Sequence, residues 1–126
     1  MSSKSIVTRE DSLKERALQI LNIRYPIEDD IKGSYKRRIF EYHPDRHPET
    51  KDDPDALKVY ENKIMLINQA YELLLDVLSK VQIDLGKYCL LEDVALVQSL
   101  LPENIKPAPI AKTEQELWIE KYGDRF

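Results

Sequence analysis

Apolar side chains recur every three or four residues along most of this chain, which is the spacing of one face of an α-helix. The most regular series lies between residues 57 and 78 and consists of Leu57, Tyr60, Ile64, Ile67, Tyr71, Leu74 and Leu78. A second series lies between residues 28 and 42 and consists of Ile31, Tyr35, Ile39 and Tyr42. No segment shows the alternating pattern of a strand hairpin. The pattern therefore predicts an all-α protein.

Three helices are expected in the first part of the chain. The first is short, at residues 12–21, and the second covers residues 28–42. The second helix should end before Pro44, because proline disfavours helical backbone in the residue that precedes it. The third helix is expected at residues 54–78. Two long helices joined by a loop are expected to pack as an antiparallel hairpin, with the short first helix across one end.

The pattern changes after Lys80. Residues 88–101 predict another helix, and the prolines within residues 102–109 indicate a linker. Thr113 begins a capping-box spacing, which predicts a last helix at 113–122 that carries Trp118. The expected division of the chain is a flexible lead-in (1–11), a three-helix domain (12–80) and a partly helical C-terminal extension (81–126).

Composition and charge exclude several classes of protein. The 126 residues are 42% hydrophobic and 33% charged, as in globular domains. A net charge of −4 argues against a protein that coats nucleic acid or an anionic membrane. Cys89 is the only cysteine in the sequence, so a reducing, cytoplasmic compartment is expected. The apolar stretch at 88–101 contains acids and is shorter than the ~20 residues that cross a bilayer, so no membrane insertion is expected.

The charge is unevenly distributed along the chain. Bases outnumber acids between residues 31 and 47, where the bases are Lys32, Lys36, Arg37, Arg38 and Arg46. Lys32, Lys36 and Arg37 lie off the apolar stripe of the second helix and are expected to face solvent. A local basic face on an acidic chain predicts an acidic partner.

His43, Pro44 and Asp45 follow directly after this basic helix. A catalytic His–Asp pair would lack an obvious nucleophile or third group. A zinc site would lack a set of about four ligands at a recognised spacing. Two further interpretations remain open. One is a structural loop that ends the helix, and the other is a recognition tip, in which the Asp45 carboxylate pairs with an arginine of a partner.

Four segments, in this order, resemble the J-domain of the DnaJ co-chaperone family, over about residues 13–76. They are ALQILNI at 17–23, IKGSYKR at 31–37, HPDR at 43–46 and INQAYELL at 67–74. An HPD tripeptide recurs by chance, but its position between the other segments makes the resemblance specific.

The resemblance implies both a fold and a function. The fold would be a short helix packed on an antiparallel helical hairpin. The protein would bind a DnaK-type heat-shock chaperone and stimulate its ATPase, without being an enzyme itself and without a cofactor or metal. The contact residues implied are His43, Pro44, Asp45, Lys32, Tyr35, Lys36, Arg37 and Arg46. Tyr35 also lies on the apolar stripe, so packing is an alternative role for it.

The chain departs from the family pattern within the second helix and after it. Arg38 stands where the family usually has a buried leucine, so its methylene stem is expected to cover the core and its charge to reach the surface. Repacking of Ile39 and Phe40 is the alternative. Gly33 is expected to weaken the helix by about 1 kcal/mol relative to alanine. The loop after Arg46 is longer than in the commonest J-domains.

Residues 81–126 lie outside the resemblance and lack a Gly/Phe-rich linker and paired CxxC motifs. These features favour the minimal class of J-domain proteins, which usually deliver the chaperone to one client. The extension is expected either to pack on the J-domain or to bind a client or scaffold. Two other functions stay open: a J-like interaction module without ATPase stimulation, and a nucleic-acid-binding helical domain, against which the net charge argues.

Overall fold

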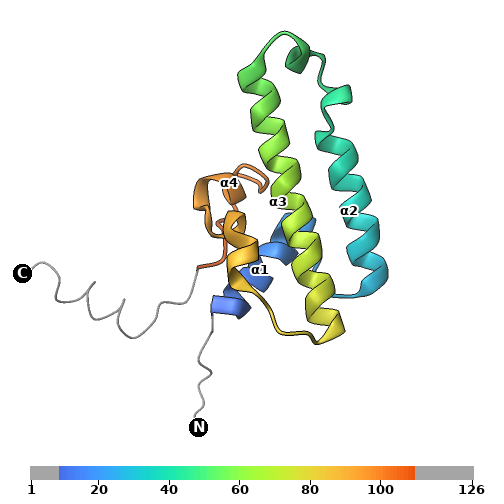
Figure 1. Cartoon of the computed structure of the whole chain (residues 1–126), viewed down its shortest axis with the longest axis vertical. Coiled ribbons are helices and arrows are strands. Elements are labelled where there is room, and N and C mark those ends of the chain that lie inside the picture. Colours follow the sequence, from blue (N-terminus) through green and yellow to red (C-terminus); the bar gives the residue numbers. More distant parts are fainter. Residues whose placement is uncertain (1–8, 110–126) are drawn as a thin grey trace, which may run out of the picture.

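The computed structural model describes residues 9–109, which form an assembly of helices (Figure 1). The three longest are α1 (Arg9–Leu21), α2 (Glu28–Tyr42) and α3 (Pro54–Ser79). The loop between α2 and α3 contains the 3₁₀ turns η1 (Pro44–Arg46) and η2 (Pro48–Lys51), and η3 (Leu85–Glu92) and α4 (Val94–Gln98) follow α3. The predicted all-α fold is confirmed. The predicted helix at 113–122 and residues 1–8 of the lead-in lie outside the described residues.

The first helix begins at Arg9 rather than at the predicted residue 12. Glu10 and Asp11 lie in its first turn, where negative charge is favoured by the helix dipole. The helix ends where Asn22 adopts left-handed backbone, with φ at 57°. The backbone amide of Ile23 then donates to the carbonyl of Leu18 over 3.0 Å, which satisfies one of the last carbonyls of the helix.

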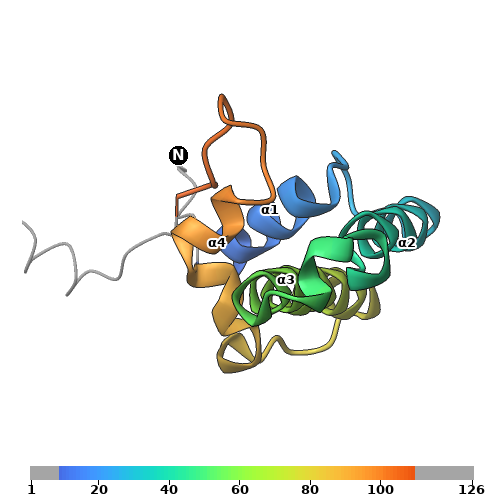
Figure 2. The ribbon, with the colours of Figure 1, turned by 90° about the horizontal axis from the view of Figure 1, so that it is seen from above.

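Helices α2 and α3 form the predicted antiparallel hairpin (Figures 1 and 2). Asp53 caps the start of α3 by accepting hydrogen bonds from its first backbone amides. Between the helices, the rings of Tyr35 and Tyr71 stack with their centroids 4.0 Å apart. The Tyr35 hydroxyl donates to Asn68 Oδ1 over 2.6 Å. Tyr35 therefore holds the two long helices together.

One hydrophobic core joins all the helical layers. Its fully or almost fully buried members are Leu13, Ala17, Leu18, Ile20, Leu21, Ile31, Leu66, Ile67, Ala70, Leu73, Leu74, Tyr88, Leu91, Val97 and Leu100. Most of them come from α1 and α3, whereas α2 contributes Ile31 alone. The last four come from the segment after α3. That segment is therefore part of the same core.

The prediction of one continuous helix over residues 88–101 is wrong. Asp93 has extended backbone (φ −79°, ψ 101°), and its carboxylate accepts a hydrogen bond from the amide of Leu96 over 3.1 Å. Aspartate competes for backbone amides in this way, so it starts a new helix instead of continuing the previous one. The result is two short helices, η3 and α4, which bury Tyr88, Leu91 and Val97 in the core.

Polar contacts also fix this segment to α1. The guanidinium of Arg16, which is only 3% exposed, donates to the carbonyls of Leu91 over 2.8 Å and Ala108 over 2.6 Å. Gln19 donates to the carbonyl of Lys106 and accepts from the amide of Ala108. Burial lowers the pKa of Arg16, and the carbonyl partners compensate for the lost water. Residues 85–109 thus pack on α1 and α3, and Figure 2 shows α4 on the far side of the molecule from α2.

Candidate functional site

The loop after α2 is a tight turn built around Pro44. His43 has extended backbone (φ −66°, ψ 134°), because the following proline disfavours helical geometry there. Pro44 then starts η1, in which the amide of Arg46 donates to the His43 carbonyl over 3.0 Å. The amide of His47 closes the turn by donating to the Pro44 carbonyl over 2.9 Å. The chain reverses direction at the tip of the hairpin, at the top of Figure 1.

His43 orients Asp45 within this turn. The backbone amide of Asp45 donates to His43 Nδ1 over 3.2 Å, so the neutral ring carries its proton on Nε2. The Asp45 side chain is 90% exposed, and its Oδ2 lies 3.7 Å from His43 Nδ1. The turn therefore presents the Asp45 carboxylate to solvent, while the ring of His43 holds the backbone of Asp45 in place. Such a carboxylate is well suited to a bidentate pair with an arginine.

A second histidine, His47, which the sequence analysis did not single out, links the turn to both long helices. His47 Nε2 donates to the carbonyl of Glu41 at the end of α2 over 2.7 Å. Its ring stacks on Tyr60 of α3 with the centroids 4.1 Å apart. The buried Thr50 hydroxyl donates to the His47 carbonyl over 2.8 Å. The His47 ring thus ties the end of α2, the turn and α3 together, which makes the tip stiff.

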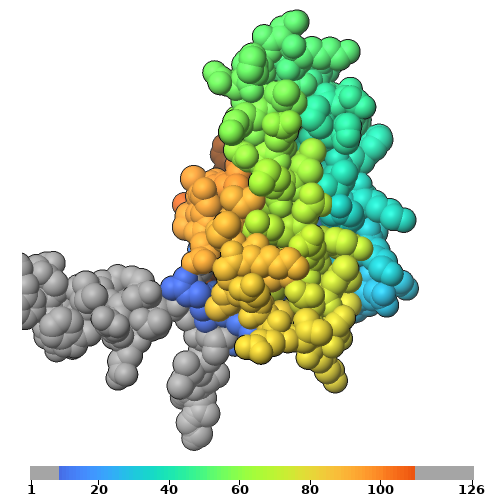
Figure 3. Space-filling model, in the orientation of Figure 1, coloured from blue at the N-terminus to red at the C-terminus, as the bar shows by residue number. Residues whose placement is uncertain are grey.

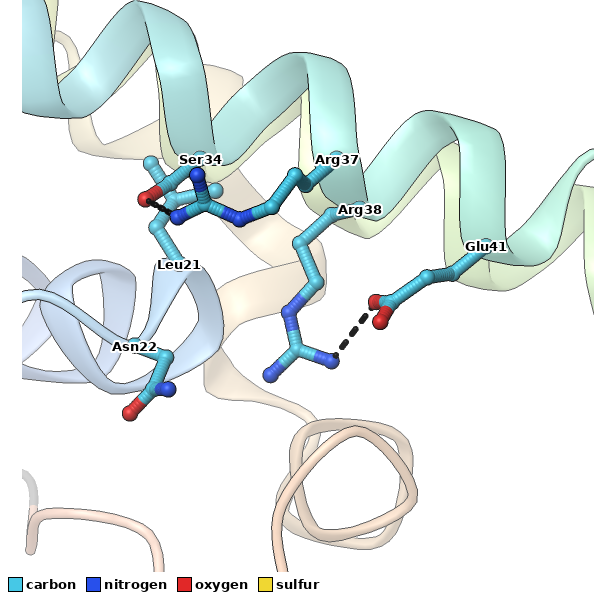
Figure 4. Close-up of a pocket in the computed structure, with 6 residues that line it drawn as sticks. All are labelled: Leu21, Asn22, Ser34, Arg37, Arg38 and Glu41. Atoms are coloured by element: carbon cyan, nitrogen blue, oxygen red, sulfur yellow. Dashed lines mark hydrogen bonds and ion pairs between the residues drawn. The ribbon is translucent and has the colours of Figure 1, made fainter.

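The predicted basic residues are divided between two surroundings. Lys32 and Lys36 are exposed on α2, and Lys32 pairs with Glu28 over 3.0 Å. A hydrogen bond from Lys32 to Glu28 raises the pKa of the lysine. Arg37 is also exposed, but it donates to Ser34 Oγ over 2.9 Å and so bends toward α1 (Figure 4). The structure therefore places the two lysines, but not Arg37, directly on the outer face of α2.

Phe40 is the residue of this surface that the sequence analysis did not include. It follows Lys32 and Lys36 at intervals of four residues, so the three lie on one side of α2. The ring is 62% exposed, and the guanidinium of Arg46 lies 4.1 Å from its centroid. Arg46 thus connects the turn with the outer face of α2. The pattern held a signal for Phe40, because a large apolar residue off the buried stripe stands out.

Arg38 does not carry its charge to the surface as expected. Its side chain is 18% exposed and lies between α2 and the end of α1 (Figure 4). It donates to the carbonyl of Ile20 over 2.9 Å and of Leu100 over 3.4 Å, and it pairs with Glu41 over 3.3 Å. The charge is therefore taken up by two carbonyl oxygens and one carboxylate within the molecule.

The side of α2 opposite Arg38 carries Lys36 and Phe40, both of which are exposed. Figure 3 shows α2 along one edge of the molecule and the segment after residue 85 against the other side of α3. Within residues 9–109, no group of three or more His, Cys, Asp or Glu could hold a metal ion. No helix of the described part is long and apolar enough to cross a membrane.

A short helix packed on a hairpin, with a braced His-Pro-Asp turn beside a helix that carries exposed lysines, is the arrangement of a J-domain. A family model described as DnaJ domain matches residues 18–84, which is more than half of the chain. The chain belongs to the DnaJ domain family.

The chain spans only 16% and 11% of the length of two curated relatives that it matches. It is 39% identical over 64 residues to the protein named Chaperone protein DnaJ of Thermotoga petrophila, covering 50% of this chain and 16% of that one. It is 44% identical over 48 residues to the Chaperone protein DnaJ of a Nitratiruptor species, covering 38% of this chain and 11% of the relative. No solved structure matches the chain.

Proposed function

We propose that this protein is a co-chaperone that binds a DnaK-type chaperone through its His43-Pro44-Asp45 turn and the basic face of α2, and that it stimulates the chaperone's ATPase. The observation that carries the proposal is the 90% exposed carboxylate of Asp45, held on a braced turn at the end of that helix. Membership of the DnaJ domain family supports it.

The contacts would divide by chemistry. Asp45 would pair with an arginine of the chaperone, and His43 and Pro44 would fix its direction. Lys36, Lys32 and Arg46 would meet acidic side chains, and Arg37 would join them by turning outward from Ser34. Tyr35 would act indirectly, by holding α2 on α3. The hydrolysis itself would take place in the nucleotide site of the chaperone, so this chain would be an activator and not an enzyme.

The proposal also assigns a role in client delivery to the C-terminal extension. Residues 85–109 pack on the domain, so they would not by themselves bind a client through the apolar side chains that they bury. We propose that the C-terminal extension, residues 81–126, gives the chain its client or scaffold through its remaining surface. The buried side chains of this extension belong to the core of the J-domain, so the targeting function would reside in its exposed surface and could not be separated by a cut at residue 80.

The test is single-turnover ATP hydrolysis by a purified DnaK-type chaperone with the full chain. Asp45→Asn and His43→Gln should abolish the stimulation while helicity stays unchanged, because both side chains are exposed. Asp52→Asn is the matched control, since it removes the same charge from the same loop and should keep full activity. Binding without stimulation would instead favour the interaction module, and unchanged stimulation in Asp45→Asn would refute the assignment of the tip.

A further inference from the structure

Arg38 is the point at which three parts of the molecule meet. It projects from α2, and its Nε donates to the carbonyl of Ile20 in the last turn of α1. Its Nη2 donates to the carbonyl of Leu100, just after α4, and its Nη1 pairs with Glu41 on α2 itself. A guanidinium suits this position because its five N–H donors are arranged in a rigid, planar fork. Leucine, the usual family residue at this place, could fill the space but could make none of these bonds.

The second helix depends on such ties more than the other long helices do. Ile31 is its one member of the buried core, and Tyr35, Ile39 and Tyr42 are only partly buried. By contrast, α1 and α3 each bury a continuous set of apolar side chains. A polar cavity of about 130 Å³ lies beside Arg38, lined in part by Asn22, so the end of α1 and α2 are not closely packed there. The direct hydrogen bonds of Arg38 therefore have a large share in fixing α2 against α1.

We propose that Arg38 is a positioning residue that makes the C-terminal extension a part of the chaperone-binding apparatus. The segment that ends at Leu100 is anchored in the core. Because Arg38 on α2 bonds the Leu100 carbonyl, the position of that segment helps to fix the orientation of α2, which carries Lys36 and Phe40 and leads into the His43 turn. This inference rests on the proposed function, because the quantity that Arg38 governs is the fraction of molecules whose α2 is aligned for binding. Loss of the hydrogen bonds of Arg38 to Ile20 and Leu100, which together form the clamp, lowers that fraction and weakens the apparent affinity in proportion.

The experiment measures the Kd for a DnaK-type chaperone, and in parallel the melting temperature, for full-length variants. Arg38→Leu removes every donor but keeps an apolar stem, so the affinity should weaken and the Kd should rise roughly threefold to tenfold. Arg38→Lys keeps the charge and one donor group, so it should restore part of the affinity. Leu100→Ala keeps the carbonyl that accepts from Arg38 but removes the buried side chain that anchors it in the core, so it should weaken binding in the wild-type background.

The double variant decides whether the two ends act together. If Arg38 transmits the position of the extension, Leu100→Ala should have no further effect on the Kd once Arg38→Leu is present. Additive effects, or an unchanged Kd in Arg38→Leu, would overturn the inference. If Arg38→Leu does not fold, Arg38→Lys takes its place in the cycle, and an unchanged Kd in Leu100→Ala would overturn the inference by itself.

A control separates the clamp from general loosening of the extension. Gln19→Met removes the hydrogen bonds of Gln19 to Lys106 and Ala108, neither of which involves α2, and leaves the bond of Arg16 to Ala108 in place, so it should leave the Kd within about twofold of the wild type. An equal loss of affinity in Gln19→Met and Arg38→Leu would show that Arg38 has no special role. If the wild-type chain neither binds nor stimulates the chaperone, the proposed function itself fails. Wild-type binding with no effect of Arg38→Leu contradicts only the present inference.

Discussion

The hydroxyl of Tyr88 donates a hydrogen bond to the carboxylate of Asp76, near the C-terminal end of α3, and the tyrosine is completely buried. The bond joins the segment after residue 80 to the last turns of α3. Because the ring lies in the same core as the side chains of α1 and α3, this segment is a structural part of the J-domain and not an appendage.

Tyr88→Phe should make stability less sensitive to alkaline pH. Burial, together with the bond to Asp76, raises the pKa of Tyr88 above its usual value of about 10. A raised pKa in the folded state gives stability that is complete below about pH 10 and is lost as the pH rises toward the folded value. Urea unfolding between pH 8 and 11 should show a shallower decline for the variant than for the wild type. Tyr35 and Tyr60, whose pKa values are also raised, would leave part of the decline in place.

Truncation after Lys80 should destabilise the domain severely. It removes four buried side chains, Tyr88, Leu91, Val97 and Leu100, and exposes the surfaces of α1 and α3 beneath them. Burial of each such side chain contributes about 1.5–3 kcal/mol, so the loss is comparable to the total stability of a small domain. Thermal unfolding followed by circular dichroism should show a broad or missing transition. A truncated chain that melts like the wild type would contradict the shared core.

Phe40→Ala should weaken chaperone binding about threefold to tenfold, because an aromatic ring at an interface typically contributes about 1 kcal/mol or more. The free energy of unfolding should hardly change, since the ring is 62% exposed. Val59→Ala is the control: Val59 is 49% exposed on α3, beside α4 and away from α2, and its removal should leave the Kd unchanged. Isothermal titration with the chaperone distinguishes the two.

The two histidines of the loop should respond in opposite ways. His43→Ala should abolish ATPase stimulation with little change in stability, because the ring is about half exposed. His47→Ala should lower the free energy of unfolding by about 2 kcal/mol, since it loses both the stack on Tyr60 and the bond to the Glu41 carbonyl. Urea unfolding and single-turnover hydrolysis, measured on both variants, check the contrast. A His47 variant as stable as the wild type would show that the ring does not brace the turn.

Gly33→Ala should stabilise the protein by about 0.5–1 kcal/mol through helix propensity. The backbone of Gly33 is ordinary helix, and an added methyl group would meet nothing closer than the Arg37 guanidinium at 3.9 Å. The melting temperature should rise while chaperone binding is unchanged. A fall in the melting temperature would mean that α2 needs the glycine for another reason.

The sequence predicts the regular parts of this fold well and the long-range polar contacts poorly. The helices of the hairpin, Glu28–Tyr42 and Pro54–Ser79, lie within a residue of their expected limits, because prolines and a regular apolar stripe define them. The break at Asp93 was missed because the apolar spacing continues through it, while the side chain caps a new helix. The partners of Arg38 come from carbonyls 18 and 62 residues away in the sequence, which no local pattern encodes.

The same limit applies to the candidate site. The turn at His43-Pro44-Asp45 could be recognised because those three residues stand side by side in the sequence, between other segments that resemble the family. The support from His47 could not, since it depends on a ring of α3 that only the folded hairpin brings near. Phe40 could be recognised in part: the sequence shows an apolar residue on the polar face of the helix, but it does not show that Arg46 lies over its ring.

Lys106 and Ala108 are bonded to α1, and the described chain, orange-red in Figures 1 and 2, ends on the side of the molecule away from α2. The described chain thus leaves the domain on the side away from the proposed contact surface. Fusions and affinity tags placed at that end should be tolerated, whereas the same cargo inserted near the tip of the hairpin would stand between the domain and the chaperone.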